Sequence, residues 1–331
     1  MHRGRITAVY AAGHFLVDLA CAFAMIRFVR PTAAWASAAL LYNFFAFAGQ
    51  MPLGLFADRF GNGRLFAAAG CLLVAAAYML PGTPTALAVT AGLGNALYHI
   101  GGGYDTLRLS DRAGPLGVFV SPGAFGLFLG FLLGRSSFPA LVPALLLMAA
   151  ATAVLLLCGR TEGSGPAFDL TGAGLLALTA LFLVVCLRSY AGFLFSFPWK
   201  TGAWAWVFVL CVVLGKTAGG YLYDRIGGVR ASAVTLGGAA ALFLASGSPV
   251  CGCAAVLLFN MTMPVTLRAA ADRLPGAKGF SFGLLTFALF LGFLPEYMGL
   301  PAIRAGWMYA VLCAASLALL LAGLKRTEST A

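Results

Sequence analysis

Ionisable and amide side chains within long apolar runs are the residues of this chain whose types and spacing could do chemistry. His14 and Asp18 are four residues apart, as are Asn95 and His99, so each pair would share one face of a helix. Arg188 stands in a further apolar run. Because an ionisable group inside a membrane span is costly, it normally faces a cavity or a partner. These side chains could therefore bind a solute or carry a proton.

Each of these groups also has a structural interpretation. His14 and Asp18 could pair only to hold their own helix in place. His99 could be a packing histidine that donates to a neighbouring carbonyl. Asn95 and Asn260, which lie 165 residues apart, could be hydrogen-bonding residues between helices.

Arg188 is the most difficult to explain by structure alone, because a permanently charged guanidinium needs an anion. That anion could be Asp18, or the carboxylate or phosphate of a solute. If a solute drew Arg188 away, Asp18 could take a proton, with His14 as a relay. This exchange would couple a proton to an anionic solute.

The elements that must position these residues are membrane spans. Of the 331 residues, 61% are hydrophobic and 9% are charged, and the mean hydropathy is +0.95. Soluble domains carry about 25% charged residues, so a soluble globular protein, a disordered chain and a nucleic-acid-binding protein are excluded. A helix crosses a bilayer in about 20 residues. The apolar runs predict twelve spans, near 6–28, 34–57, 65–81, 85–105, 114–134, 139–158, 169–193, 201–223, 230–246, 251–268, 279–296 and 303–324.

The basic residues predict the orientation of these spans. Fourteen of the 21 fall on the side of the N-terminus, five fall on the other side, and Arg188 and Lys216 lie within spans. By the positive-inside rule, both termini are expected in the cytoplasm, in a multi-pass protein of the plasma (inner) membrane. This bias also explains most of the net charge of +11 without an anionic ligand.

The chain contains a repeat of about half its length. The segment GLFADRFGNGR at 54–64 is echoed by GYLYDRIGGVR at 220–230, and Thr-Leu-Arg at 106–108 recurs at 266–268. Such repeats are typical of transporters built from two parallel halves, which bind substrate between them near the bilayer midplane. The predicted organisation is an N-terminal six-helix bundle at 1–158, a cytoplasmic linker at 159–168 and a C-terminal six-helix bundle at 169–331.

The motif G-x-x-x-D-R-x-G followed by a basic residue, between the second and third spans, resembles the signature loop of the major facilitator superfamily. The resemblance implies an all-α fold with twelve transmembrane helices in two pseudo-symmetric bundles. It also implies that spans 1, 4, 7 and 10 line a central cavity and that the signature loop is a cytoplasmic latch. The candidate gating residues are then Gly54, Asp58, Arg59, Arg64, Lys216, Asp224 and Arg225. The alternatives are a charged turn that only sets topology, and a cavity position for Lys216.

A narrower resemblance concerns GHFLVDLACAF at 13–23 and GLGNALYHIGGG at 92–103, which are similar to the fosmidomycin-resistance branch of that superfamily. That resemblance implies export of drugs or metabolites. The chain departs from related patterns at Phe131, where an antiporter-type helix would carry Pro, and at Ala88, where many proton-coupled members carry Arg.

Together these features predict a secondary active transporter that moves a small anionic or zwitterionic organic solute by alternating access, coupled to protons. The alternative is a divalent-metal transporter that uses His14, Asp18 and His99. The chain lacks the paired Asp-rich, H-E-x-x-H and Walker motifs of membrane enzymes and pumps. We therefore expect no enzyme activity, no cofactor, no resident metal and no nucleic-acid partner, and a monomer in the lipid bilayer.

The predicted topology can be tested by cysteine labelling. A cysteine placed in the 105–113 loop should react with a membrane-impermeant maleimide only after the cells are opened, provided that the native cysteines are blocked first. Labelling of this loop from outside intact cells would reverse the orientation.

Overall fold

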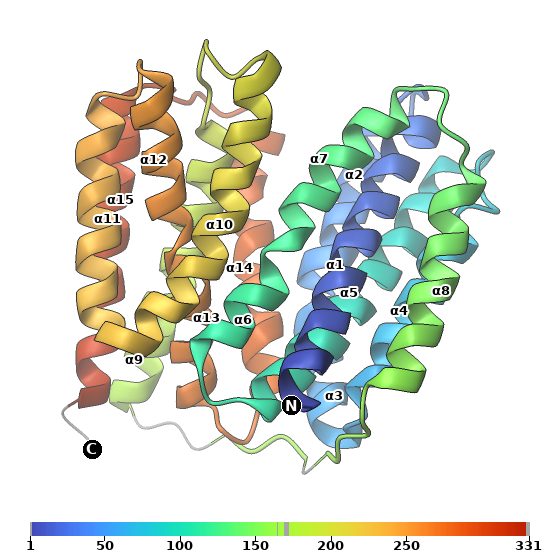
Figure 1. Cartoon of the computed structure of the whole chain (residues 1–331), viewed down its shortest axis with the longest axis horizontal. Coiled ribbons are helices and arrows are strands. Elements are labelled where there is room, and N and C mark those ends of the chain that lie inside the picture. The colour runs from blue at the N-terminus through green and yellow to red at the C-terminus, as the bar shows by residue number, and fades with distance from the viewer. Residues whose placement is uncertain (1, 164, 169–171, 329–331) are drawn as a thin grey trace. The chain divides into compact units, whose positions relative to one another are not determined.

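The computed structural model describes residues 2–163, 165–168 and 172–328, and most of these residues are helical (Figure 1). The only β-bridge among them joins Gly61 to Glu162 in antiparallel fashion. Residues 169–171, the start of the seventh expected span, lie outside the described residues. In chain order the helices are α1 (His2–Ala24), the π-helix η1 (Met25–Val29), α2 (Trp35–Asn43), the π-helix η2 (Phe44–Ala48), α3 (Gln50–Phe60), α4 (Gly63–Ala77), α5 (Pro84–Leu109), α6 (Ala113–Val120), α7 (Pro122–Gly134), α8 (Leu141–Leu157), α9 (Gly172–Leu194), α10 (Gly202–Ile226), α11 (Gly228–Leu244), α12 (Pro249–Asn260), α13 (Thr262–Arg273), α14 (Lys278–Tyr297) and α15 (Gly306–Glu328).

Every expected span corresponds to one helix or to consecutive helices. In the described part of the chain, eight helical stretches are long and apolar enough to cross a membrane, and α4, α8 and α11 are apolar but shorter. The remaining span, α5, has 26 residues and carries the polar groups of the fourth predicted span. The prediction of an all-α polytopic membrane protein is confirmed.

Two of the expected spans are broken at prolines. The fifth span divides at Ser121, just before Pro122, and the tenth divides at Met261, shortly before Pro264. Proline lacks the amide proton that would bond the carbonyl four residues earlier. Near the first break the Ser121 hydroxyl donates to the carbonyl of Val118, 3.2 Å away, which is the carbonyl that Pro122 leaves free. The first two spans instead contain the π-helices η1 and η2.

Several helices continue beyond the ends predicted for their spans. α5, α10 and α13 continue to Leu109, Ile226 and Arg273, so Asp224 and Arg225 belong to the last turn of α10. Charged last turns can extend a helix into water beyond the apolar run from which the span was predicted. The third span ends at Ala77 rather than at 81, in tight turns that precede Pro81 and Gly82.

The described residues form two compact units. The first unit falls within 1–110, 122–167 and 276–287, and the second within 111–121, 168–275 and 288–331. Each unit therefore contains helical residues from the other half of the sequence. The first unit includes the beginning of α14, and the second includes α6.

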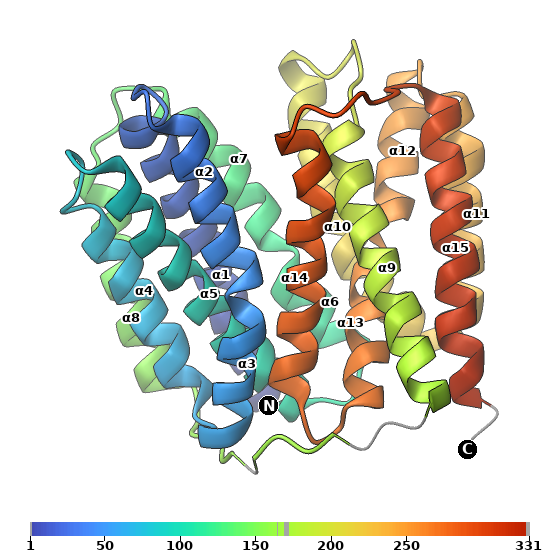
Figure 2. The ribbon, with the colours of Figure 1, turned by 180° about the vertical axis from the view of Figure 1, so that it is seen from behind.

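Within the first unit, α1 and α7 lie side by side with their backbones in contact (Figure 1). A Cβ atom on Gly126 would lie 2.2 Å from the carbonyl oxygen of Phe15, and one on Gly130 would lie 2.3 Å from that of Leu19. Only glycine permits this approach, which brings α7 directly over the polar face of α1. In the second unit, α15 packs against α9 and α11 (Figure 2).

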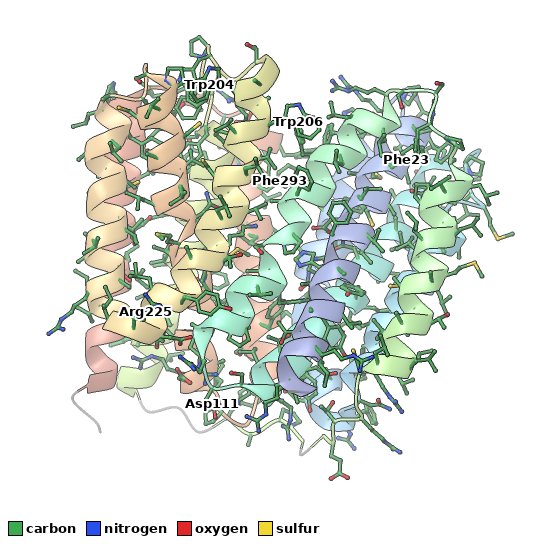
Figure 3. The ribbon with its side chains drawn as sticks, in the orientation of Figure 1. Phe23, Asp111, Trp204, Trp206, Arg225 and Phe293 are labelled. Atoms are coloured by element: carbon green, nitrogen blue, oxygen red, sulfur yellow. The ribbon has the colours of Figure 1, made fainter. Side chains whose placement is uncertain are left out.

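The second unit is polarised along its helices. Trp204 and Trp206 lie at one end of it, and Asp111 and Arg225 lie at the opposite end (Figure 3). Tryptophan is typical of membrane interfaces, and charged residues gather where helices leave the bilayer. These positions are consistent with helices that span a membrane.

Candidate functional site

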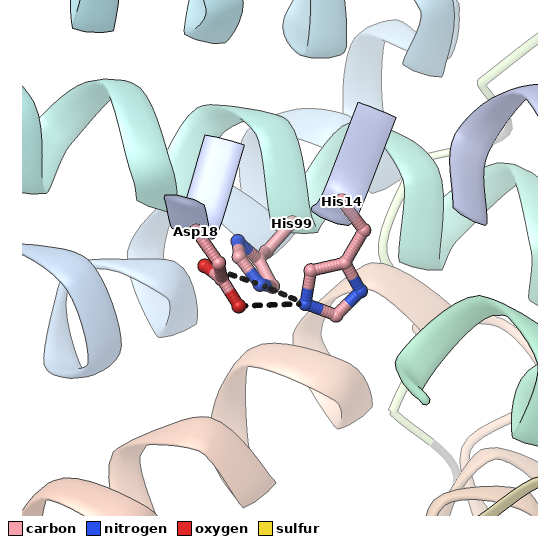
Figure 4. Close-up of side chains that lie close together, drawn as sticks. All are labelled: His14, Asp18 and His99. Carbon is pink, nitrogen blue, oxygen red and sulfur yellow. Dashed lines mark hydrogen bonds and ion pairs between the residues drawn. The ribbon is translucent and has the colours of Figure 1, made fainter. Parts of the chain in front are cut away.

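The first two polar pairs meet in the first unit, on facing sides of α1 and α5. His14 Nε2 lies 3.2 Å from Asp18 Oδ2, and His99 Nε2 lies 3.8 Å from Asp18 Oδ1 (Figure 4). The two histidines approach each other to 2.8 Å between their Nε2 atoms. Asn95 Nδ2 donates to Asp18 Oδ1 at 2.9 Å. We call these four residues the α1–α5 cluster.

The hydrogen bonds of the α1–α5 cluster assign its protons. His99 Nδ1 lies 2.8 Å from the Asn95 carbonyl oxygen, which can only accept, so Nδ1 carries a proton. In a neutral imidazole, His99 Nε2 is then an acceptor. With both imidazoles neutral, His14 Nε2 is the donor in this pair, and its proton also faces Asp18 Oδ2. In this arrangement one proton lies between two acceptors, His99 Nε2 and Asp18 Oδ2. An additional proton could bind to an imidazole or to the carboxylate.

Gly123 at the start of α7 covers this cluster. A Cβ atom there would lie 2.3 Å from both Asp18 Oδ2 and His14 Nε2. The structure gives it a specific position against the acid–imidazole pair.

The other two predicted substrate or coupling residues lie in the second unit. Arg188 on α9 has an exposed fraction of 8%, and its Nη1 donates to Thr266 Oγ1 on α13 at 3.1 Å. Thr266 is the first residue of the repeated Thr-Leu-Arg sequence. Asn260 does not take part in this hydrogen bond between Arg188 and Thr266. The Asn260 Nδ2 atom donates instead to the carbonyl of Val256 in its own helix, at 2.8 Å. Arg188 is thus a buried cation held by one hydroxyl group.

The first of the two signature loops brings a carboxylate onto a helix N-terminus. Asp58 on α3 accepts hydrogen bonds from the backbone amides of Gly279 and Phe280, each at 2.8 Å, in the first turn of α14. Its exposed fraction is 3%. Gly54 makes the approach possible, since a Cβ atom there would lie 2.2 Å from the carbonyl oxygen of Gly279. We call this contact the first cap.

The repeat produces the same contact in the second unit. Asp224 on α10 accepts from the amides of Ala113 and Gly114 in the first turn of α6, at 2.8 and 2.9 Å. Arg112 Nε lies 3.6 Å from the same carboxylate. Gly220 lies against Ala113, as Gly54 lies against Gly279. This contact is the second cap.

The remaining gating candidates lie around the two caps. Arg64 donates to the carbonyl oxygens of Leu155 and Cys158 at the end of α8, at 3.3 and 3.4 Å. Arg59 lies over the ring of Phe60, 5.8 Å from its centroid.

Two candidates belong to α10. Lys216 Nζ donates to the carbonyl of Val120 at the end of α6, at 3.4 Å. Arg225 follows Asp224 directly and is exposed (Figure 3).

A third buried carboxylate, besides Asp18 and Asp58, was not among the residues predicted from the sequence. Asp105 on α5 has an exposed fraction of 1% and accepts from Tyr10 Oη and, at 2.6 Å, from Thr161 Oγ1 of the linker. It is the last residue of the predicted span at 85–105, where that span meets the predicted loop. The pair Thr161 and Asp105 is 56 residues apart, and no local pattern connects them.

Comparison with known proteins decides the fold. The chain is similar to the E. coli fucose:proton symporter FucP, with a TM-score of 0.65, 15% identity and coverage of 97% of this chain and 98% of that chain. A second FucP structure, in the outward conformation, has a TM-score of 0.64 at 15% identity and covers 95% and 97% of the two chains. The human organic anion transporter MFSD10 has a TM-score of 0.74 at 16% identity and covers 97% and 100%.

The chain has the fold of the major facilitator superfamily. This confirms the predicted fold class of twelve transmembrane helices in two pseudo-symmetric bundles. No family model and no curated protein sequence matches the chain.

The two caps of this major facilitator fold can be separated by hydrogen–deuterium exchange in detergent. Asp58→Asn should speed exchange of the Gly279 and Phe280 amides about tenfold, because the loss of a carboxylate at a helix N-terminus costs on the order of 1–2 kcal/mol. The amides of Ala113 and Gly114 should be unaffected. Asp224→Asn is the matched control and should have the opposite pattern. Equal changes at both helices in either variant would contradict independent capping.

Proposed function

We propose that the protein is a secondary active transporter that moves a small anionic or zwitterionic organic solute by alternating access, coupled to protons. The observation that carries the proposal is the proton-sharing geometry of His14, Asp18 and His99, with 2.8 Å between the two Nε2 atoms. The fold is consistent with this function, since the similar structures are of a fucose:proton symporter and an organic anion transporter.

Arg188 is the proposed anion-binding residue. A guanidinium cannot be neutralised in a protein and prefers bidentate contact with a carboxylate or phosphate. Arg188 is buried, and the hydroxyl of Thr266 satisfies only one of its five N–H groups. An anionic group of the solute would supply the missing charge and hydrogen bonds.

The α1–α5 cluster is the proposed proton site. A proton shared by two imidazoles and a carboxylate can be gained or lost with little movement of heavy atoms. His14, Asp18 and His99 are all buried or nearly so, so their protonation would be controlled by which side of the membrane reaches them. Asn95 would hold the Asp18 carboxylate in position while the cluster gains a proton and while it loses one.

A divalent-metal transporter is the second candidate, because one ligand atom from each of His14, Asp18 and His99 lies within 4.8 Å of the others. Two nitrogens at 2.0–2.1 Å from a tetrahedral zinc ion are separated by about 3.3 Å. The observed 2.8 Å between Nε2 atoms is a hydrogen-bond distance instead. This geometry favours the proton over the metal.

The remaining parts of the proposal concern location and organisation. We propose a monomer in the plasma (inner) membrane with cytoplasmic termini, and two bundles at 1–158 and 169–331 joined by the linker at 159–168. Efflux is proposed on the resemblance of the 13–23 and 92–103 segments to the fosmidomycin-resistance branch.

The gating role of the two caps can be tested once a transported solute is found. Asp58→Ala should slow transport several-fold and leave the affinity for the solute in detergent unchanged, because the carboxylate binds the first turn of α14 and none of the proposed binding residues. Loss of binding by a folded Asp58→Ala variant would show that Asp58 belongs to the binding site.

The coupling scheme predicts different losses at Asp18 and Arg188. In proteoliposomes screened with small carboxylates, phosphates and amino acids, a pH gradient should drive accumulation by the natural protein. Asp18→Asn should lose accumulation but keep solute exchange, and Arg188→Ala should lose binding at least tenfold. Accumulation driven by a pH gradient in Asp18→Asn would refute the scheme.

The exposed ion pair of Glu296 and Arg304 supplies matched controls, with 2.6 Å between Arg304 Nη2 and Glu296 Oε1. Glu296→Gln and Arg304→Ala remove the same charges outside the proposed sites and should transport normally. Addition of Zn²⁺ or Mn²⁺ in the same screen tests the second candidate, and metal accumulation that requires His14, Asp18 and His99 would favour it.

A further inference from the structure

The linker between the two halves of the sequence is held against the first signature loop. The Asn62 amide donates to the Thr161 carbonyl at 2.6 Å, and the Gly63 amide donates to Thr161 Oγ1 at 3.2 Å. Gly61 and Glu162 form the antiparallel bridge. These contacts make the beginning of the linker a short extended strand along the loop.

This strand is anchored in the interior of the first unit. Thr161 Oγ1 donates to Asp105 Oδ1 at 2.6 Å, and Tyr10 Oη donates to the other oxygen of the same carboxylate. Tyr104 Oη donates to the carbonyl of Glu162 at 3.2 Å. A buried carboxylate that accepts from α1 and from the linker joins the two firmly, since hydrogen bonds to a charged group are stronger than neutral ones.

The linker then contacts both partners of the first cap. The Gly165 amide donates to the backbone carbonyl of Asp58 at 3.0 Å. The Ala167 amide donates to the carbonyl of Gly276 at 3.1 Å, just before α14 begins. The Asp58 carboxylate binds the first turn of that helix. The linker is therefore bonded on both sides of the contact between α3 and α14.

The second cap has no equivalent arrangement among the described residues. Thr106 and Thr266 are equivalent in the repeat, so Asp105 corresponds to Val265. The valine side chain cannot accept a hydrogen bond from a hydroxyl group. At the turn equivalent to 61–63, a cavity of about 250 Å³ is lined by Gly227, Gly228 and Leu324, among other residues. Two caps that are alike in their carboxylates thus differ in what surrounds them.

We propose that Thr161, Glu162, Gly163, Gly165 and Ala167 form a strap that keeps the first cap closed, with Asp105 as the positioning residue that anchors it through Thr161. The first cap then opens only when the strap is released, whereas the second cap opens without this step. This proposal rests on the proposed transport function for its role, but the contacts can be tested without any solute.

The test is hydrogen–deuterium exchange on the full chain in detergent, with Thr161→Val as the main variant. Valine keeps the shape and removes the hydroxyl that joins Asp105 to the strap. We expect exchange at Gly165 and Ala167 and at the capped amides of Gly279 and Phe280 to rise between about twofold and tenfold, the range for loss of one hydrogen bond. Exchange at Ala113 and Gly114, in the second cap, should not change.

Three further variants make the result decisive. Thr161→Ser restores the hydroxyl and should return exchange to the natural level. Thr152→Val is the matched control, because Thr152 bonds only the Met148 carbonyl of its own helix, and it should change nothing at either cap. Asp105→Ala removes the acceptor oxygens of the anchor, so it tests the same contact from the other side if Thr161→Val folds poorly. It should raise exchange at the same four amides.

Several results would overturn the proposal. One is faster exchange at Gly165 and Ala167 with unchanged exchange at Gly279 and Phe280, since the strap would then have no hold on the cap. Another is an equal rise at both caps, which would indicate general destabilisation. The exchange experiment uses no solute, so a failed transport screen would not change the conclusion about the strap. A failed exchange test would likewise not affect the transport proposal.

Discussion

The first amides of a helix have no partner within the helix and need acceptors from elsewhere. In both units a buried aspartate supplies two acceptor oxygens and a negative charge to the positive end of a helix dipole. Asp58 and Asp224 thereby fix where α14 and α6 begin. Gly54 and Gly220 allow these approaches, and the linker is bonded to the backbone of Asp58 beside the first of them.

The general architecture could be predicted from the sequence because its signals are long or repeated. Each membrane span is an apolar run of about 20 residues, and the 166-residue offset between the signature loops ties Asp58 to Asp224. The four-residue spacing of His14 and Asp18, and of Asn95 and His99, predicted two polar helix faces. The contact between those faces required the structure, since no short pattern states which helices are neighbours.

Other features could not be predicted because each depends on a partner far along the chain. Asp105 stood at the end of a predicted span, and its partner Thr161 lies in a linker of unremarkable composition. Gly123 is one of 42 glycines, and only the position of α7 on α1 gives it significance. The breaks at Ser121 and Met261 have a local cause in Pro122 and Pro264, but membrane helices tolerate proline so often that the residue alone does not predict a break.

The docked linker has a consequence for how such a chain could have arisen by duplication. Two identical ancestral half-proteins, made as separate polypeptides, would each have contributed one capping aspartate, and their assembly would have been symmetric. Joining them end to end created a connecting peptide that could lie against only one of the two loops. In this chain that peptide is bonded to the first loop, through Asn62 and Gly63. End-to-end fusion by itself would therefore have made the two loops different before any substitution did.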